Sequence, residues 1–375
     1  MNSSNATESG GIVVQCRRPD EASAVEALLA THGLTGRTVS TRKAGTAATY
    51  LHLRLTEAAL QEWAPNHDTT RLRERMRLDV RHDIAHLERE ILVALLASPV
   101  LFDVPSRDEL LAAINIRRNI IQAGHRTALN FYTSKADRPR DCWRHDEDRG
   151  FVVLPGIPLI DALVKATQPA CGGKLYAFSC YRATEYVIML GIAQELANCN
   201  PPLLELLQQQ CETRIIRSGQ FHDVFLHEYG SQDQPLPTHY YVPGDRLWFR
   251  NPDEASSDIT GYEGSWVVYL GGGLFTNFWK RDQPYTLSAK CLEIYHWRNG
   301  TFRNSAGELA MDEAVVEQRV AATLADPAKT ASILQQMMRW REPQGCYGNG
   351  GCIDTTREAP RWVCPGTGNL VLPLI

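Results

Sequence analysis

Apolar and polar residues alternate along three short stretches near the start of the chain, and a period of two is typical of half-buried β-strands. The clearest alternation is Tyr50-Leu51-His52-Leu53-Arg54-Leu55. Between the first two stretches the apolar residues recur with helical spacing as far as Gly33, and Thr56 is placed to cap another helix. The expected elements are a strand over 12–16, a helix over 20–34, strands over 37–42 and 49–55, and a helix over 56–63.

The order strand, helix, strand, strand, helix predicts a small ferredoxin-like β-α-β-β-α module over residues 11–66. We expect residues 1–10 to be a disordered leader, and Pro65-Asn66-His67-Asp68 to be the linker to a larger domain. The module would therefore be an appended unit and not part of the main core.

The middle of the chain is helical first and rich in strands afterwards. Helical periodicity predicts helices over 70–98, 107–127 (capped by Ser106, with Glu109 near the capping-box position), 159–166, 181–196 and 203–217. The segment 220–280 changes character, because aromatic and β-branched runs separated by Gly and Pro predict antiparallel strands. These runs are residues 240–242, 245–249 and 266–270. The pattern is that of an α+β core.

The C-terminal part has a different composition. Residues 312–341 contain two more helical patterns, whereas 342–375 are rich in Gly, Pro and Cys and show little predicted structure. We therefore divide the chain into a core over 70–310 and a helical, then Cys/Gly/Pro-rich, extension over 311–375.

Charge and length exclude several classes of partner. The 375 residues have a formal net charge of -4, which gives no general attraction to nucleic acid or to an anionic membrane. No apolar run approaches the roughly 20 residues that span a bilayer, and the first residues lack the basic and apolar regions of a secretory signal. We expect a cytoplasmic protein without nucleic-acid or membrane partners, and the oligomeric state stays open.

The ten cysteines are too sparse for a disulfide framework in a chain of this length. Cys346, Cys352 and Cys364 follow a C-x5-C-x11-C spacing, which lacks the closely spaced pairs of structural zinc sites. We therefore expect no metal and no organic cofactor.

Cys180 is the candidate nucleophile, because it directly precedes the helical pattern that begins at Tyr181. A thiol at a helix N-terminus faces unpaired N–H groups and the positive end of the helix dipole, and both favour the thiolate. The alternative is a small buried apolar residue, which is the more frequent role of cysteine. A cysteine at the start of a helix that a sheet follows is typical of papain-like and NlpC/P60-like enzymes.

Several short motifs together resemble one family, the bacterial spore-coat transglutaminases, over roughly residues 88–300. The similar segments, in the family's order, are Ser98-Pro99-Val100-Leu101-Phe102-Asp103, Arg117-Arg118-Asn119-Ile120, Leu175 to Cys180, Gly244 to Pro252, and Gly264 to Gly271. The resemblance implies an NlpC/P60-like core, protein-glutamine gamma-glutamyltransferase activity, and Cys180 as the nucleophile.

The same resemblance shows which partners of the thiol differ in this chain. Ser179 stands where the family has Glu before its Cys, and Ser265 stands where the family has the Glu that acts as base. Glu263 precedes Ser265 by two residues, so on a strand it would project from the same face and could replace that base. Its alternative role is an exposed carboxylate at the strand end.

Histidines offer a second set of candidate bases, since His is a usual partner of a catalytic Cys. We retain His227 as a candidate catalytic residue, although its neighbourhood resembles a segment in which the His is structural. His222 and His239 flank the same strand region.

Candidate substrate-binding residues lie at or beside the changed positions: Ser179, Trp266, Asn277 and Trp279. Trp266 and Trp279 could form the walls of a tunnel that excludes water, so that an amine competes with hydrolysis. Packing in the core of the sheet is the alternative for most aromatic residues of this region.

The sequence therefore predicts cysteine-dependent acyl transfer through a thioester on Cys180. The donor would be a protein glutamine or a small acyl compound, and an amine would accept the acyl group. Alternatives are a deamidase or amidase that uses water, an inactive protein that keeps the fold for binding, and a coat-type protein that is itself cross-linked.

Overall fold

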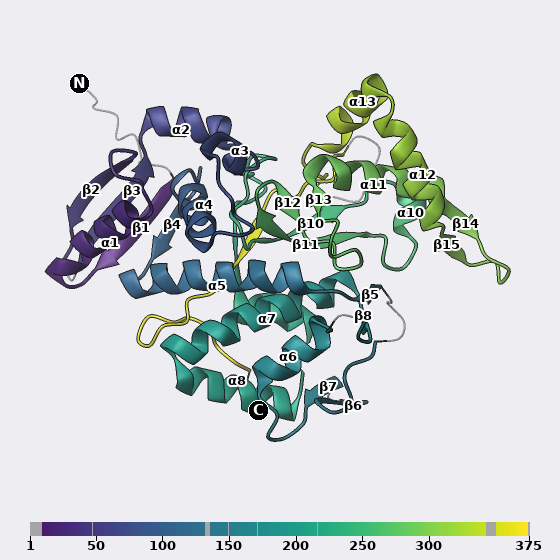
Figure 1. Ribbon diagram of the computed structural model, residues 1–375, viewed down its shortest axis with the longest axis horizontal. Coiled ribbons are helices and arrows are strands. Elements are labelled where there is room, and N and C mark those ends of the chain that lie inside the picture. The colour runs from purple at the N-terminus through teal and green to yellow at the C-terminus, as the bar shows by residue number, and fades with distance from the viewer. Residues whose placement is uncertain are drawn as a thin grey trace.

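Helix α5 (Arg107–Arg126) is the central element of the α+β structure, a computed structural model that describes residues 10–46, 48–131, 136–148, 150–170, 172–215, 217–342 and 350–373. An N-terminal sheet and its helices pack on one side of α5, and helix α7 (Cys180–Cys199) crosses it on the other (Figure 1). Ser106 caps α5 as predicted, since its hydroxyl accepts from the N–H of Glu109 at 3.1 Å.

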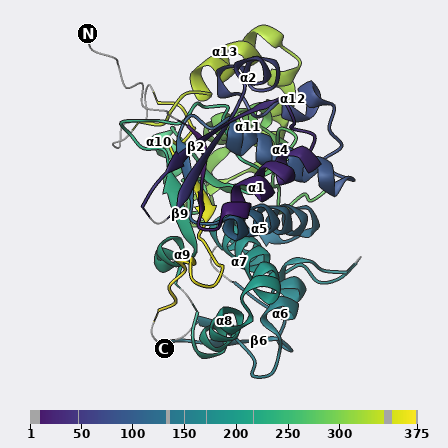
Figure 2. The same cartoon turned by 90° about the vertical axis from the view of Figure 1, so that its left-hand side faces the viewer.

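The N-terminal elements follow the predicted order. They are β1 (Gly11–Cys16), α1 (Pro19–Thr31), β2 (Thr38–Ala44), β3 (Thr49–Leu55), α2 (Glu57–Trp63) and the short 3-10 helix η1 (Pro65–His67). Thr56 caps α2 by accepting from Ala59. Figure 2, turned so that this end of the molecule faces the viewer, shows β2 and α1 in front of α5.

The N-terminal sheet has the strand order β2-β3-β1-β4. Its last strand, β4 (Leu101–Val104), lies beyond the predicted linker and runs parallel to β1. The apolar core beneath this sheet is continuous with α4 (Ile84–Leu96), α5 and Tyr240. A ferredoxin-like module, and a domain boundary near residue 66, therefore stay predictions.

The single helix predicted over 70–98 is wrong, because the chain forms two helices, α3 (Leu72–Met76) and α4. Arg77 ends α3 in the left-handed region with a φ of 55°. Asp83 then starts α4, since its carboxylate accepts from the N–H groups of Ala85 and His86. A helical pattern in the side chains did not reveal this break in the backbone.

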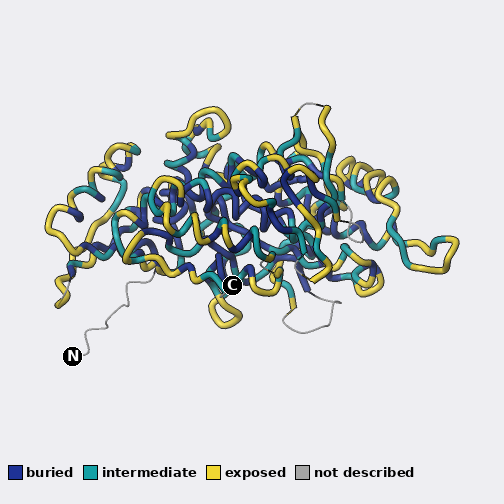
Figure 3. Tube along the Cα trace, turned by 90° about the horizontal axis from the view of Figure 1, so that it is seen from below, coloured by how far each residue is buried: buried dark blue, intermediate teal, exposed yellow. Residues whose placement is uncertain are grey.

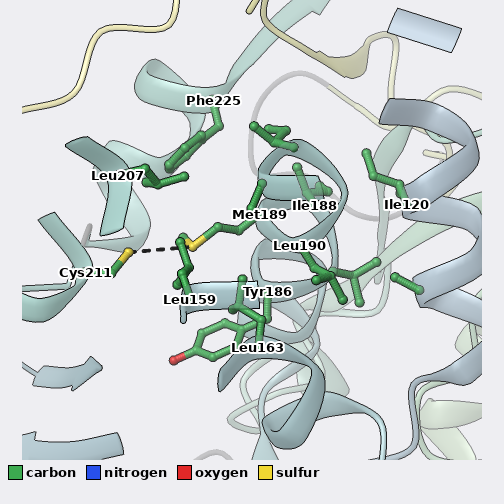
Figure 4. Close-up of a cluster of buried hydrophobic side chains, with 14 of the residues drawn as sticks. Ile120, Leu159, Leu163, Tyr186, Ile188, Met189, Leu190, Leu207, Cys211 and Phe225 are labelled. Atoms are coloured by element: carbon green, nitrogen blue, oxygen red, sulfur yellow. Dashed lines mark hydrogen bonds between the residues drawn. The ribbon is translucent and has the colours of Figure 1, made fainter. Parts of the chain in front are cut away.

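A layer of helices lies below α5 in Figure 1 and contributes most of one large apolar cluster. Its members are α6 (Leu159–Thr167), α7, α8 (Pro201–Thr213) and α9 (Ser218–Phe225). Figure 4 shows Met189 of α7 in contact with Cys211 of α8, whose sulfur lies 4.0 Å away. Gly191 lets α7 approach α5 closely, because a Cβ there would lie 2.5 Å from Ile120.

The central sheet has the order β13-β12-β11-β10-β16-β9. Its strands are β9 (Leu226–Tyr229), β10 (Arg246–Arg250), β11 (Gly264–Gly271), β12 (Leu274–Phe275), β13 (Tyr285–Thr286) and β16 (Arg357–Pro360). β16 corrects the expectation of little structure in 342–375, because it is inserted between β10 and β9. Such pairing between distant segments leaves no local signal in the sequence.

Residues 240–242 do not form the predicted strand. Tyr240 and Tyr241 are fully buried, but the N–H of Tyr241 donates to the hydroxyl of Thr69 at 2.8 Å and not to a neighbouring strand. Burial of both aromatic rings explains the apolar run.

The elements of the C-terminal part are mostly helices, and they pack against the central sheet. They are α10 (Glu254–Ser257), α11 (Leu287–Gly300), the hairpin of β14 (Thr301–Arg303) and β15 (Leu309–Met311), α12 (Glu313–Leu324) and α13 (Pro327–Met337). Two small pairs, β5 (Asn130–Phe131) with β8 (Ala177–Phe178) and β6 (Trp143–Asp146) with β7 (Gly150–Val153), complete the fold.

Figure 3 shows buried residues along the middle of the molecule and exposed residues in its peripheral loops. In the part of the chain that the structure describes, no helix has the length and apolar character needed to cross a bilayer.

Candidate active site

Cys180 is the first residue of α7, the helix that crosses α5. Ser179 is the N-cap, and its hydroxyl accepts from the N–H of Arg182 at 3.3 Å. The strand pair β5–β8 leads directly into this cap. The predicted position of the thiol at a helix N-terminus is therefore present, and Ser179 has a structural role as the cap.

The partly buried Cys180 borders two hollows. One is a cavity of about 450 Å³ that also contacts Ser265, Asn277 and Trp279. The other measures about 300 Å³ and also contacts Ser179, Glu263 and Trp266. Cys180 thus borders both hollows, and every predicted site residue except His227 borders one or the other.

Opposing influences act on the protonation of the thiol. Burial raises the pKa of Cys180 above its ordinary value; the N–H of Trp266, the ammonium of Lys290 and the N–H of Tyr181 oppose this rise. The charge of Glu263 adds to it. The net direction is upward, which favours the neutral thiol.

The first residues of strand β11 lie close to strand β10 because Gly264 has no side chain. A Cβ at Gly264 would lie 2.2 Å from Nε1 of Trp248 and 2.5 Å from the carbonyl oxygen of Phe249. Asn251 holds the preceding loop, since its side-chain amide donates to the Tyr262 carbonyl at 2.9 Å. The Gly and Asn-Pro motifs thus position the strand.

Trp266 is fixed between two other aromatic rings. It stacks on Trp248 with centroids 6.1 Å apart and meets the edge of Tyr181 at 5.0 Å. The guanidinium of Arg246 lies 4.7 Å from the Trp266 ring. These contacts fix the Trp266 ring, and the backbone N–H of Trp266 at the start of β11 acts on the sulfur of Cys180.

Glu263 precedes β11 and is exposed. Its carboxylate accepts from the N–H of Gly261 at 3.0 Å, so the side chain folds back on its own turn. It borders the smaller hollow, whereas Ser265 borders the larger one. The sequence pattern predicts that Glu263 and Ser265 project from the same face of a strand. They border different hollows because Glu263 lies outside β11, which begins at Gly264.

Asn277 and Trp279 belong to the loop that closes one side of the larger cavity. The Asn277 amide donates to the Gln283 carbonyl at 2.9 Å, and its oxygen accepts from the N–H of Lys280 at 3.1 Å. Trp279 packs on Phe131 with centroids 5.1 Å apart. Both residues therefore shape the cavity wall.

The structure does not bring His227 to the thiol. β9 is separated from β11 by β16 and β10, and three strand spacings amount to about 14 Å. His227 packs beside Trp362 and borders a different small cavity. Burial lowers the pKa of His227 to about 4, which keeps it neutral.

The other two histidines also have partners elsewhere. His222 bonds through Nδ1 to Glu358 at 2.6 Å. His239 contacts the hydroxyl of Thr238 at 3.1 Å, and its carbonyl accepts from the N–H of Thr69. Neither borders a hollow that contains Cys180.

Lys290 of α11 is the charged residue of the larger cavity that sequence reasoning missed. A signal was present: Leu287, Cys291 and Ile294 mark the buried face of α11, and Lys290 falls on that face. Carboxylates of α11 and α12, Glu293 and Glu313, also border the cavity. Within the described ranges, no three His, Cys, Asp or Glu side chains gather to hold a metal ion.

Comparison with known proteins places the chain in a family. A sequence model described as protein-glutamine gamma-glutamyltransferase matches residues 69–364. The match extends past the 88–300 range of the motifs and includes β16.

Two enzymes named protein-glutamine gamma-glutamyltransferase are similar in sequence. The one from Halalkalibacterium halodurans is 25% identical over 210 residues, which are 53% of this chain and 66% of the relative. The one from Bacillus subtilis is 26% identical over 188 residues, which are 48% and 69% of the respective chains. The shared stretches thus span about two thirds of each relative.

A transglutaminase structure from Geobacillus stearothermophilus, without its C-terminal extension, aligns with 57% of this chain and 98% of its own. The TM-score is 0.39 and the identity is 20%. The family assignment rests on the sequence match over residues 69–364. The chain belongs to the protein-glutamine gamma-glutamyltransferase family.

Proposed function

We propose that this chain transfers acyl groups from a carboxamide to an amine through a thioester on Cys180. The Cys180 thiolate attacks the carboxamide carbon, a C–S bond forms, and the C–N bond breaks; the leaving nitrogen takes the proton that the Cys180 thiol gave up and departs as ammonia. The amine then attacks the thioester carbon, the C–S bond breaks, and the proton that the amine loses returns the thiolate to the thiol. Each step exchanges one acyl bond for another, so no cofactor or redox partner is required.

The observation that carries this proposal is the place of Cys180 at a helix N-terminus between two hollows. The N–H groups of Trp266 and Tyr181 act on its sulfur. Donors that stabilise the thiolate also suit the negative charge that develops on the substrate carbonyl oxygen. A merely structural cysteine needs neither hollow.

The aromatic lining favours an amine over water as acceptor. Tyr262, Trp279, Tyr285 and Trp297 border the larger cavity together with the apolar face of α12. A lining of this kind excludes water from the thioester and leaves space for an alkyl chain. A glutamine side chain and a primary alkyl amine are both small enough to enter hollows of about 450 and 300 Å³.

One alternative has an observation in its favour. Burial raises the pKa of Cys180, and Ser265 occupies the position at which the resemblance implies a carboxylate. A protein that binds glutamine or amine side chains without turnover would have the same cavity. The two functions differ in whether a covalent intermediate forms.

Ammonia release tests the proposal. The protein is incubated with an N-acylated glutaminyl-glycine donor and a primary alkyl amine, and ammonia and the new amide are measured together. We expect equal amounts of both from the native protein and neither from Cys180→Ala. Ammonia without amide would indicate a deamidase, and no product from the native protein would support the binding function.

A further inference from the structure

Lys290 is a lysine held inside the larger cavity and not on the surface. Its side chain is 4% exposed. Nζ donates to Oε2 of Glu293 at 3.1 Å and lies 3.8 Å from the centroid of the Tyr285 ring. These two contacts fix the position of the ammonium. A flexible lysine on the surface has no such fixed position.

A buried ammonium needs a compensating charge, and here it has only a partly exposed one. Glu293 is 25% exposed at its side chain and is shared, since it also interacts with Tyr285. Burying a lysine costs stability unless the charge is paired and hydrogen-bonded. The pair with the partly exposed Glu293 holds the Lys290 ammonium beside the cavity that Cys180 also borders.

The charges that face Cys180 come from several elements. In the larger cavity they are Lys280 in the loop after β12, Lys290 and Glu293 on α11, and Glu313 and Glu317 on α12. Glu263 borders the smaller hollow. Tyr181, Tyr262 and Tyr285 are the neighbouring phenols, and the pKa of each is raised by burial, so they stay neutral.

Among these charges Lys290 is the buried cation that shares the larger cavity with Cys180. Lys280 also borders the cavity, but its ammonium pairs with Glu317 in an exposed position. Coulomb interaction is much weaker in an exposed, solvated position than in a buried one. Glu293 and Lys290 share the cavity, and the ammonium opposes the rise in the pKa of Cys180.

We propose that the buried ammonium of Lys290 stabilises the Cys180 thiolate at a site where Ser265 supplies no carboxylate. Lys290 acts through its charge on the thiol and is a positioning residue, not a proton acceptor. The inference rests on the proposed role of Cys180 as nucleophile. It also explains how a half-buried thiol can react although burial favours its neutral form.

The test is the pH profile of Cys180 alkylation, which needs no substrate. Native protein and variants react with iodoacetamide between pH 6 and 10, and the adduct at Cys180 is quantified by peptide mapping. Lys290→Met should move the midpoint upward by about one pH unit, which is about a tenfold lower rate below both midpoints. Lys290→Arg keeps the charge and should keep the midpoint near that of the native protein.

Two further variants serve as controls: one should shift the alkylation midpoint of Cys180 in the opposite direction, and the other should not shift it. Glu293→Gln removes the carboxylate that shares the ammonium, so it should lower the midpoint. Lys280→Met removes the other lysine of the same cavity and should leave the midpoint unchanged. The double variant Lys290→Met/Glu293→Gln keeps the pair neutral and should still have a midpoint above that of the native protein.

Cys199 serves as an internal reference for folding. It is partly buried on the far end of α7, and the neighbouring thiol of Cys364 lowers its pKa. Its alkylation rate should be equal in all variants, and a change would identify a misfolded one, to be replaced by the Lys290→Gln variant. Superimposable Cys180 profiles in native protein and Lys290→Met, with Cys199 unchanged, would overturn the proposal.

Failure of this inference and failure of the proposed function are distinguishable. An unchanged midpoint in an active enzyme refutes the role of Lys290 alone. A shifted midpoint without amide formation supports the effect of Lys290 on the thiol and refutes the acyl transfer.

Discussion

The guanidinium of Arg117 on α5 and the carboxylate of Asp245 before β10 form an ion pair at 2.8 Å in the buried centre of the protein. Their side chains are 4% and 0% exposed. The hydroxyl of Tyr229 and the N–H of Val242 also donate to Asp245. Two motifs that lie 128 residues apart thus meet in one network that joins α5 to the central sheet.

Loss of one partner should leave a buried charge without compensation. We predict that Arg117→Met lowers the free energy of unfolding by about 3–5 kcal/mol, measured by chemical denaturation. The adjacent Arg118 pairs with Glu88 at 2.5 Å in a partly exposed position. Arg118→Met should therefore cost at most about 1 kcal/mol. Equal losses in both variants would contradict the structural role of the Arg117 pair.

Glu90 gives stability a dependence on pH. Its carboxylate is fully buried and accepts from the N–H of Gly272 at 2.8 Å, and burial raises its pKa from 4.5 to about 7. The folded state therefore binds a proton that the unfolded state releases between these values. Stability should fall as the pH rises from about 4.5 to about 7, by up to about 3 kcal/mol.

Glu90→Gln removes the titrating group and keeps an acceptor for Gly272. We predict that this variant is more stable than the native protein above pH 7 and loses this part of the pH dependence. Thermal unfolding at pH 5 and pH 8 measures both effects. A variant with the same pH dependence as the native protein would place the responsible group elsewhere.

Glu109 attaches the C-terminal segment to α5. Its two carboxylate oxygens accept from the N–H groups of Val363 and Cys364, at 3.0 and 2.8 Å, and from the hydroxyl of Thr367. Glu109→Ala leaves two buried N–H groups without acceptors, which costs on the order of 2–4 kcal/mol. We expect trypsin to cleave after Arg361 much faster in this variant.

The neighbouring Asp108 provides the control for that experiment, because it is exposed and pairs with Arg107. Asp108→Ala should leave the cleavage rate after Arg361 unchanged. If Glu109→Ala is cleaved no faster than Asp108→Ala, the segment is held by other contacts.

The Glu263→Gln variant shows whether Glu263 acts as a general base or only as a negative charge near Cys180, because the two roles change the alkylation rate in opposite directions. Its charge raises the pKa of Cys180, so Glu263→Gln should lower the alkylation midpoint and increase the rate at pH 7. A general base at the same position would have the opposite effect, since its loss slows deprotonation. A slower reaction in Glu263→Gln would therefore restore Glu263 as the base and contradict the role given to Lys290.

Local patterns predicted the elements whose signals are local. The caps at Thr56 and Ser106, the alternation of 49–55 and the start of α7 at Cys180 all follow from neighbouring residues. Glu109 lies in the first turn of α5, yet its carboxylate binds the distant C-terminal segment. The position of a residue in a helix was predictable, but not its partner 254 residues away.

Distant pairing explains what the sequence did not reveal about the site. β16 lies between β9 and β10, so His227 on β9 is far from the thiol. The sequence did not predict β16, because its surroundings are rich in Gly, Pro and Cys. Lys290 lies at the cavity because α11 packs against β13. The thiol was predictable from its helix, whereas its electrostatic partner depended on how the sheet is assembled.

The mass of the intact protein during turnover tests the central claim most directly. The protein is mixed with the N-acylated glutaminyl-glycine donor without an amine, the reaction is quenched in acid, and the intact mass is measured by mass spectrometry. The account predicts an adduct with the mass of the donor less ammonia, located on Cys180, absent from Cys180→Ala, and discharged when a primary amine is added. Amide formation that persists in Cys180→Ala, or an adduct on another residue, would contradict it.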